Sequence, residues 1–435
     1  MRTVPKLIVV ALCLLWSVSA HAVAVEKVVS PGGIVAWLVQ DHSNPIVSLS
    51  LAFRGGAALV PDDKAGLASM TVALLDEGAG DMDSQTYQAR LRDLSVSLGF
   101  SAGQDALYGR MKTLTDHLDE AFGLLSLALT EPRFDRQAVE RIRSQMLTDL
   151  TRQIQDPNAM AQRAFAKLVY GSHPYGRAAE GVPGTIEAID IPDLQAFAKT
   201  RLAQDVLYVA VAGDITPERL GPLLDRTFGG LPAAAQPAAL EQANVLTDGR
   251  VEIIRRPIPQ SVVVFGQEGI GRDDPDWYAA YVMNYILGGD GLNSRLMTEI
   301  RVKRGLSYGV YSFLAPKERG ALIEGTVSSA NDRVAQSLRL IREEWAHMAE
   351  NGVTEAELAD AKTYLLGSFP LQMDSTQSIS ALLIAIQLDR LGIDYLDRRA
   401  GLINGVTKDD IDRVARRLLD AGKLSAVIVG DPEGF

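Results

Sequence analysis

The sequence repeats itself once, and this repeat limits the possible folds more than any other feature. Three pairs of segments match in the same order: 62–78 with 273–289, 135–154 with 354–366, and 209–214 with 426–431. The first pair is offset by 211 residues and the last by 217. A shared order with a nearly constant offset predicts two copies of one α+β unit. A generic packing pattern, without a true repeat, is the alternative.

The two copies are separated by a segment of different composition. Residues 231–243 read LPAAAQPAALEQA, rich in alanine and proline and without strong apolar periodicity. Such a composition is typical of an inter-domain linker. We therefore expect a first domain over 23–230, a linker over 231–250 and a second domain over 251–435.

The first 22 residues have the layout of a cleaved secretory signal peptide. Two basic residues precede an apolar run over 7–18, and Ala-His-Ala follows at 20–22. The apolar run is too short for a membrane span. We expect cleavage after Ala22 and a periplasmic location if the host has an outer membrane. The only cysteine, Cys13, lies in this segment, so the mature chain would have no disulfide and no thiolate ligand.

Charge and motif content exclude several classes of function. The chain has 43 Lys and Arg against 54 Asp and Glu, and loss of the two basic residues of the leader changes the net charge from −11 to −13. An acidic surface argues against nucleic acid and against anionic membranes as partners. No G-x-S-x-G motif is present, and no two histidines have the spacing of metal ligands on a helix.

The stretch 274–313 contains the best candidates for catalytic residues. Its pattern predicts a helix, a glycine turn, a second helix, a tight turn at Gly305 and a strand that begins near Tyr308. Arg301 precedes Tyr308 by seven residues. A guanidinium and a phenol near one turn can both donate hydrogen bonds to a polarised carbonyl. On their own, such basic residues are also typical of an ordinary helix C-terminus.

The order of motifs in this stretch resembles the second-domain signature of the pitrilysin/insulinase family of zinc peptidases. The signature consists of Leu287-Gly288-Gly289, Ser294-Arg295-Leu296, Arg301, and Arg304 to Tyr308. This family includes the mitochondrial processing peptidases, and the resemblance extends to His-Pro-Tyr-Gly at 173–176. It implies an α+β fold of two homologous tandem domains, each a mainly antiparallel sheet packed on helices. It also implies catalytic roles for Arg301 and Tyr308, and substrate-binding roles for Gly288, Gly289, Ser294 and Arg295.

The same resemblance predicts that this chain holds no metal. Active members carry H-x-x-E-H on the first helix, with two zinc-binding histidines and a glutamate base. Here the motif should begin at Ser69, so Ser69 and Ala73 replace the histidines and Val72 replaces the glutamate. Glu140 and Asp149 are the acidic candidates for a third ligand, but neither can bind zinc tightly alone.

Two functions follow from these observations. The first is the non-zinc-binding subunit of a heterodimeric periplasmic zinc metallopeptidase that cleaves unfolded peptides. A homologous partner with H-x-x-E-H would bring Zn²⁺ and the base, while Arg301 and Tyr308 would bind the substrate carbonyl and stabilise the oxyanion. The second is a catalytically silent homologue, either a scaffold or a peptide-binding subunit, in which the same two residues serve packing only.

Overall fold

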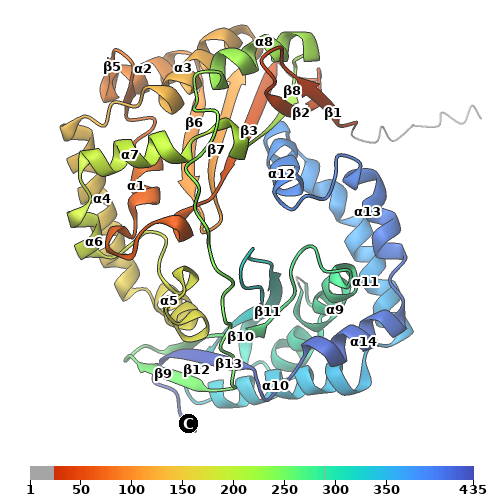
Figure 1. Ribbon diagram of the computed structural model, residues 1–435. Helices are drawn as coiled ribbons and strands as arrows, with labels where there is room; N and C mark the ends of the chain where they lie inside the picture. Colours follow the sequence, from red (N-terminus) through yellow and green to blue (C-terminus); the bar gives the residue numbers. More distant parts are fainter. Residues whose placement is uncertain (1–23, 290) are drawn as a thin grey trace, which may run out of the picture.

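The protein is described here by a computed structural model that covers residues 24–289 and 291–435. The expected signal peptide over 1–22 lies outside the described residues. Figure 1 shows two halves, each with a sheet and its helices, arranged one above the other. Among the described helices, none combines the length and the apolar character needed to cross a bilayer.

The first half contains a six-stranded sheet with the order β1-β2-β8-β3-β7-β6. Its strands are β1 (Glu26–Val29), β2 (Val35–Gln40), β3 (Ile46–Arg54), β6 (Ser97–Ala102), β7 (Ala106–Leu114) and β8 (Leu207–Gly213). Strands β2 and β8 run parallel, whereas the other pairs are antiparallel. All residues of β3 except the two at its ends are buried, so this strand needs cover on both faces.

The second half repeats this topology in a five-stranded sheet with the order β11-β12-β10-β13-β9. Its strands are β9 (Val251–Arg255), β10 (Gln260–Glu268), β11 (Ser307–Ala315), β12 (Leu322–Ala330) and β13 (Ser425–Gly430). They occupy the places of β2, β3, β6, β7 and β8, and the parallel pair recurs as β9 with β13. The repeated segments at 209–214 and 426–431 fall on the equivalent strands β8 and β13. The α+β fold class is confirmed.

Helices flank both sheets. Those of the first part of the chain are α1 (Leu67–Val72), α2 (Ser84–Asp93), α3 (Leu118–Thr130), α4 (Arg136–Gln155), α5 (Pro157–Tyr170), α6 (Pro183–Ala188), α7 (Ile191–Arg201) and α8 (Pro217–Phe228). Those of the second part are α9 (Trp277–Gly288), α10 (Val334–Asn351), α11 (Glu355–Gly367), α12 (Thr376–Leu388), α13 (Tyr395–Asn404) and α14 (Lys408–Leu418). Side-chain caps set several helix starts; the Asp83 carboxylate, for example, accepts the N–H of Thr86 at the start of α2.

One face of each sheet is covered by a helix that comes from the other half of the chain. Helix α12 packs on β3 and β8, and α5 packs on β10 and β13; in Figure 1 the blue α12 lies beside β3 and the yellow α5 beside β10. Polar contacts support the apolar packing of α12: the hydroxyls of Ser50 and Ser380 lie 2.9 Å apart, and Gln387 donates to the Val209 carbonyl at 3.1 Å. The two halves therefore share their cores.

Helix α9 begins at Trp277, and Asp274 does not cap it. The Asp274 carboxylate instead accepts the Asp276 N–H at 2.8 Å and pairs with Arg417 at 2.6 Å. Between α8 and β9, residues 229–250 contain no helix or strand. The domain limits given above stay predictions.

The exchange of helices predicts that cutting back one core side chain in α12 destabilises the whole chain. Leu383 is fully buried against the first sheet, so Leu383→Ala should lower the free energy of unfolding by about 2–5 kcal/mol, because it leaves a cavity. Urea unfolding followed by circular dichroism measures this value. Leu371→Ala, at a position that is 74% exposed, is the control and should change it by less than about 0.5 kcal/mol. An equal effect of both substitutions would contradict the shared core.

Candidate functional site

Arg301 and Tyr308 come from two consecutive elements joined by a tight turn. Arg301 lies in a π-helix, η6 (Met297–Val302), and Tyr308 is the second residue of β11. Gly305 joins them with φ +60°, a left-handed conformation that glycine adopts without steric cost, and its N–H donates to the Arg301 carbonyl at 2.9 Å. The turn therefore reverses the direction of the chain, and the side chains of Arg301 and Tyr308 lie on the same side of it.

The two side chains lie in contact with each other and with solvent. The guanidinium carbon of Arg301 is 4.6 Å from the centre of the Tyr308 ring, a cation–π geometry. Tyr308 is 86% exposed. Within residues 24–289 and 291–435, neither the Tyr308 hydroxyl nor the Arg301 guanidinium has a hydrogen-bond partner. Both donors are therefore available to an oxygen from another molecule.

The four residues expected to bind substrate lie nearby but mostly serve packing. Gly288 is buried, and a Cβ there would lie 2.3 Å from the Ser312 hydroxyl, so only glycine lets α9 approach β11. A Cβ on Gly289 would likewise lie 2.8 Å from the Cα of Tyr285. Ser294 is 5% exposed, and its hydroxyl has no partner among the described residues.

Arg295 is tied to α11 through a bidentate ion pair. Its Nε and Nη2 lie 2.7 and 2.9 Å from the two carboxylate oxygens of Glu357, and Nη2 also donates to the Gly352 carbonyl at 2.9 Å. Burial by itself would raise the pKa of Glu357, but hydrogen bonds from Arg295 and Thr354 outweigh it and hold that pKa at about 2. The substrate-binding roles of all four residues stay predictions.

The residues at the zinc-motif positions do not fit a zinc ion. Ala73 has no donor atom, Val72 is 3% exposed and apolar, and the Ser69 hydroxyl donates to the Ala179 carbonyl at 3.0 Å. On α4, Glu140 faces Arg143 at 3.5 Å and Asp149 faces Arg152 at 3.3 Å. In the described part of the chain, no three His, Cys, Asp or Glu side chains are grouped so as to hold a metal.

Two acidic residues just after the motif also lack a metal-binding arrangement. Glu77 accepts a hydrogen bond from Ser84 and pairs with Arg141. Asp76 accepts from the side-chain amide of Gln88 at 3.3 Å. Burial raises the pKa of Asp76 to about 6. Asp76 is thus a half-buried carboxyl with a raised pKa, and the described part of the chain places no group of three His, Cys, Asp or Glu side chains around it to hold a metal.

The His-Pro-Tyr-Gly motif joins the two halves. The Tyr175 hydroxyl donates to the Asp105 carboxylate and accepts the Arg319 N–H at 3.2 Å, and the Tyr170 hydroxyl donates to the Gly320 carbonyl at 2.6 Å. These bonds hold the loop between β11 and β12. His173 bonds through Nε2 to the Glu241 carbonyl at 3.0 Å, so its role is structural here.

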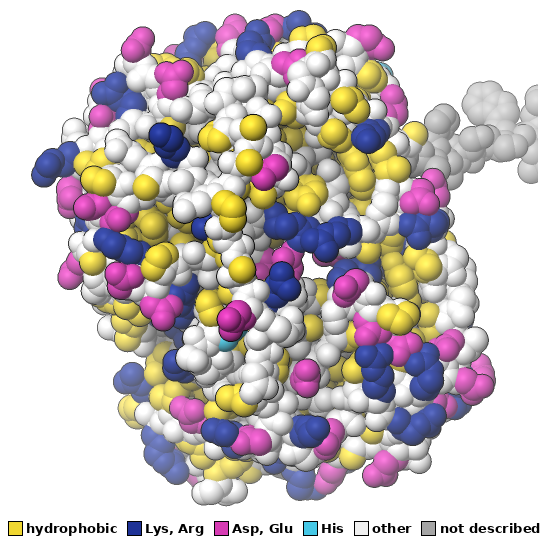
Figure 2. Space-filling view, in the orientation of Figure 1, with side chains coloured by type: hydrophobic (Ala, Val, Ile, Leu, Met, Phe, Trp, Pro, Cys, Tyr) yellow, Lys and Arg dark blue, Asp and Glu magenta, His cyan; other side chains and the backbone are white. Residues whose placement is uncertain are grey.

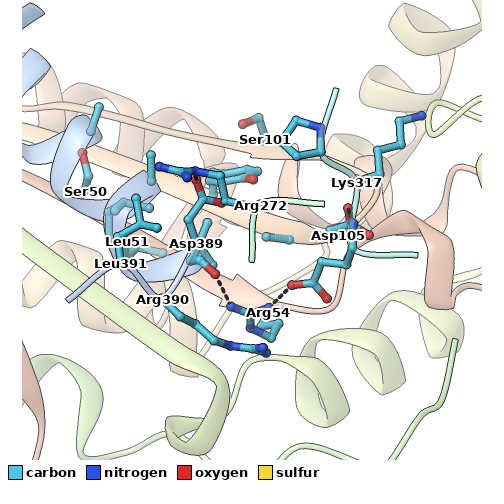
Figure 3. A pocket seen from close by; sticks show the side chains of 18 of the residues that line it. Ser50, Leu51, Arg54, Ser101, Asp105, Arg272, Lys317, Asp389, Arg390 and Leu391 are labelled. Atoms are coloured by element: carbon cyan, nitrogen blue, oxygen red, sulfur yellow. Dashed lines mark hydrogen bonds and ion pairs between the residues drawn. The ribbon is translucent and has the colours of Figure 1, made fainter. Parts of the chain in front are cut away.

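A cavity lies between the two halves of the chain, and the sequence did not predict it. Its volume is about 810 Å³, within the range of small-molecule sites. Figure 3 shows charged side chains from both halves around it, among them Arg54 and Asp105 of the first half and Arg272, Lys317 and Asp389 of the second. Arg301 and Tyr308 do not line it. No sequence motif marks these residues, because they come from five separate segments.

Comparisons with known proteins agree with this geometry. The family model described as peptidase M16 inactive domain matches residues 188–365. The non-peptidase homolog YmxG of Helicobacter pylori is 29% identical over 343 residues, which cover 78% of each chain. An uncharacterized zinc protease of Streptomyces coelicolor is 28% identical over 74% of each chain. The crystal structure of a peptidase M16 inactive domain from Pseudomonas fluorescens superposes with a TM-score of 0.87 at 29% identity, covering 94% of this chain and 98% of that one.

The chain thus has the two-unit fold of these relatives, and Ser69, Val72 and Ala73 stand where the resemblance places the zinc motif. By these matches the chain is similar to the M16 family, the pitrilysin/insulinase zinc peptidases, and in particular to proteins described as its inactive domain or as a non-peptidase homolog.

The raised pKa of the half-buried Asp76 predicts a pH-dependent stability. Its pKa is about 6 in the folded chain and 3.8 in an unfolded one, so the folded state favours the proton and loses stability as pH rises from about 4 to about 6. Asp76→Asn should therefore raise the free energy of unfolding by about 1–3 kcal/mol at pH 8 and change it little at pH 3.5. Urea unfolding at both pH values tests this. Asp81→Asn, at an exposed position, is the control; a gain for Asp76→Asn that is the same at both pH values would contradict the assignment.

Proposed function

We propose that this chain is the non-zinc-binding subunit of a two-chain metallopeptidase and supplies Arg301 and Tyr308 to the active site of its partner. The partner would be a homologous subunit with an intact H-x-x-E-H motif, which holds Zn²⁺. The observation that carries the proposal is the contact between an exposed phenol and a guanidinium, both without partners in the described residues. A pair with a packing role would be buried and bonded instead.

The hydrogen-bond donors of Arg301 and Tyr308 suit the stabilisation of an oxyanion during peptide hydrolysis. When a peptide carbonyl is attacked by water, its oxygen gains negative charge, and donors aimed at this oxygen lower the barrier. The Tyr308 hydroxyl is a single directional donor, whereas the Arg301 guanidinium adds a fixed positive charge. Their mutual contact keeps the phenol beside the cation, which favours a hydrogen bond from Tyr308 to the developing oxyanion.

The position of the pair also suits an unfolded peptide as substrate. Strand β11 is the edge of its sheet, so its outer backbone N–H and C=O groups are unpaired within the sheet. An extended peptide can pair with such an edge as an added strand. Tyr311 and Phe313 lie on the same strand and are exposed, and they offer apolar contacts to alternate side chains of the peptide.

The leading competing function is a silent scaffold or peptide-binding subunit. In that case the zinc-bearing partner would cleave peptides at the same rate with or without the Arg301 and Tyr308 side chains. The two functions are separated by kinetics of the reconstituted pair, because only the first requires these donors in the transition state.

We predict that Tyr308→Phe and Arg301→Ala each lower kcat of the reconstituted complex by at least about 100-fold, because each removes an oxyanion donor. Turnover of a quenched fluorescent peptide by equimolar subunits measures this effect. Tyr311→Phe, which removes a phenol hydroxyl from the same exposed strand, is the matched control and should keep kcat within about twofold. Normal turnover by both Tyr308→Phe and Arg301→Ala, with the complex intact by size-exclusion chromatography, would establish the scaffold function.

We also predict that the isolated chain binds no stoichiometric zinc and cleaves no peptide. Ser69, Val72 and Ala73 provide no imidazole, thiolate or carboxylate, the groups that bind zinc in protein sites. Elemental analysis after dialysis against zinc gives the metal content. One zinc per chain after this treatment would show that the metal-binding half of the site is present in this chain.

A further inference from the structure

The central cavity adjoins a second one, and three arginines line both. The second cavity, of about 370 Å³, lies between the first half and the linker. Arg54, Arg319 and Arg390 line the first and the second cavity alike, as do the acidic residues Asp105 and Glu318, so the positive charges outnumber the negative ones at the junction. The three arginines come from the end of β3, from the loop after β11 and from the turn after α12. Figure 3 shows Arg390 pointing toward Arg54 across the floor of the larger cavity.

The charge of the larger cavity is opposite to that of the chain. Its lining has six Lys and Arg side chains against four Asp and Glu, whereas the whole chain has 43 against 54. Figure 2 shows dark blue side chains gathered at the hollow in the centre of this face. Because low-dielectric walls focus the field of such charges, the cavity attracts anions although the protein as a whole repels them.

Some of the positively charged side chains that line the larger cavity form ion pairs or hydrogen bonds, and others do not. Arg54 pairs with Glu318 and donates to the Leu388 carbonyl, and Arg272 lies 3.3 Å from Asp389. The side chains of Arg110, Arg319 and Arg390, by contrast, have no ion pair or hydrogen bond in the described parts of the chain. Two of these three free guanidiniums are at the junction of the cavities.

The backbone and the aromatic neighbours fix this arrangement. Arg390 has φ +56°, a left-handed conformation that costs free energy in a non-glycine residue. Its N–H donates to the Gln387 carbonyl at 3.1 Å, which ends α12 at this turn. Arg54 stacks over the Tyr208 ring at 5.5 Å. The cations are thus carried by fixed elements of both halves, as expected for a binding site.

We propose that the junction of the two cavities is an oxyanion-binding site in which Arg319 and Arg390, beside Arg54, hold a carboxylate or phosphate group of a ligand. The planar guanidinium fork matches both groups in bidentate geometry. The volume of the larger cavity admits a short peptide end or a small phosphorylated molecule. This site is separate from Arg301 and Tyr308 and does not depend on the peptidase role.

Isothermal titration calorimetry of the intact mature chain tests the site with three probes. These are an acetylated pentaalanine with a free C-terminal carboxylate, the same peptide as its C-terminal amide, and inorganic phosphate. We expect the free-carboxylate peptide or phosphate to bind with Kd below about 1 mM at low salt. Binding of the acid but not the amide identifies a peptide carboxylate as the ligand group, whereas binding of phosphate alone identifies a phosphate.

The variant Arg319→Ala/Arg390→Asn should weaken that binding by at least tenfold. Both side chains are exposed and unpaired, and asparagine tolerates the left-handed backbone at 390, so the fold should be retained, as thermal melting will show. Arg90→Ala/Arg92→Asn on α2 removes two exposed, unpaired arginines far along the chain and is the matched control. If no probe binds, or if the Arg319/Arg390 variant binds as well as the control, the proposal is wrong.

Discussion

The reciprocal packing of α5 and α12 is the interaction on which the rest of the structure depends. The central strands of both sheets are buried on both faces, so each sheet needs a second apolar cover, and the other half supplies it. Because the halves share their cores in this way, the cavity between them has fixed walls. The same constraint positions β11, whose following loop is held by Tyr170 and Tyr175 from the opposite half.

Strand β11 connects the two sites proposed above. Tyr308 stands at its start, and Lys317 to Arg319 follow its end. Nine residues of extended strand span about 30 Å, so the Arg301–Tyr308 pair and the cationic cavity are well separated. Under the two proposals above, donor groups for oxygen atoms lie at two sites, while Ser69, Val72 and Ala73 occupy the positions at which the resemblance places the zinc motif.

Much of the fold and part of the site follow from the sequence. The repeat predicted two related α+β units, and the glycine at 305 predicted the turn that joins Arg301 to Tyr308. The exchange of helices was not predictable, since the apolar periodicity of α12 is the same whether the helix covers its own sheet or that of the other half. The bidentate pair of Arg295 with Glu357, 62 residues apart, and the gathering of Arg54, Arg319 and Arg390 likewise arise only from tertiary structure.

The most direct test of the account is an experimental structure of this chain bound to a zinc-bearing M16 subunit and an uncleaved peptide, with the partner's glutamate base substituted. The account predicts that the Tyr308 hydroxyl lies about 3 Å from the oxygen of the scissile carbonyl at the partner's zinc, with the Arg301 guanidinium beside it. A complex in which both side chains point away from the partner's metal, more than about 10 Å from the peptide, would contradict it.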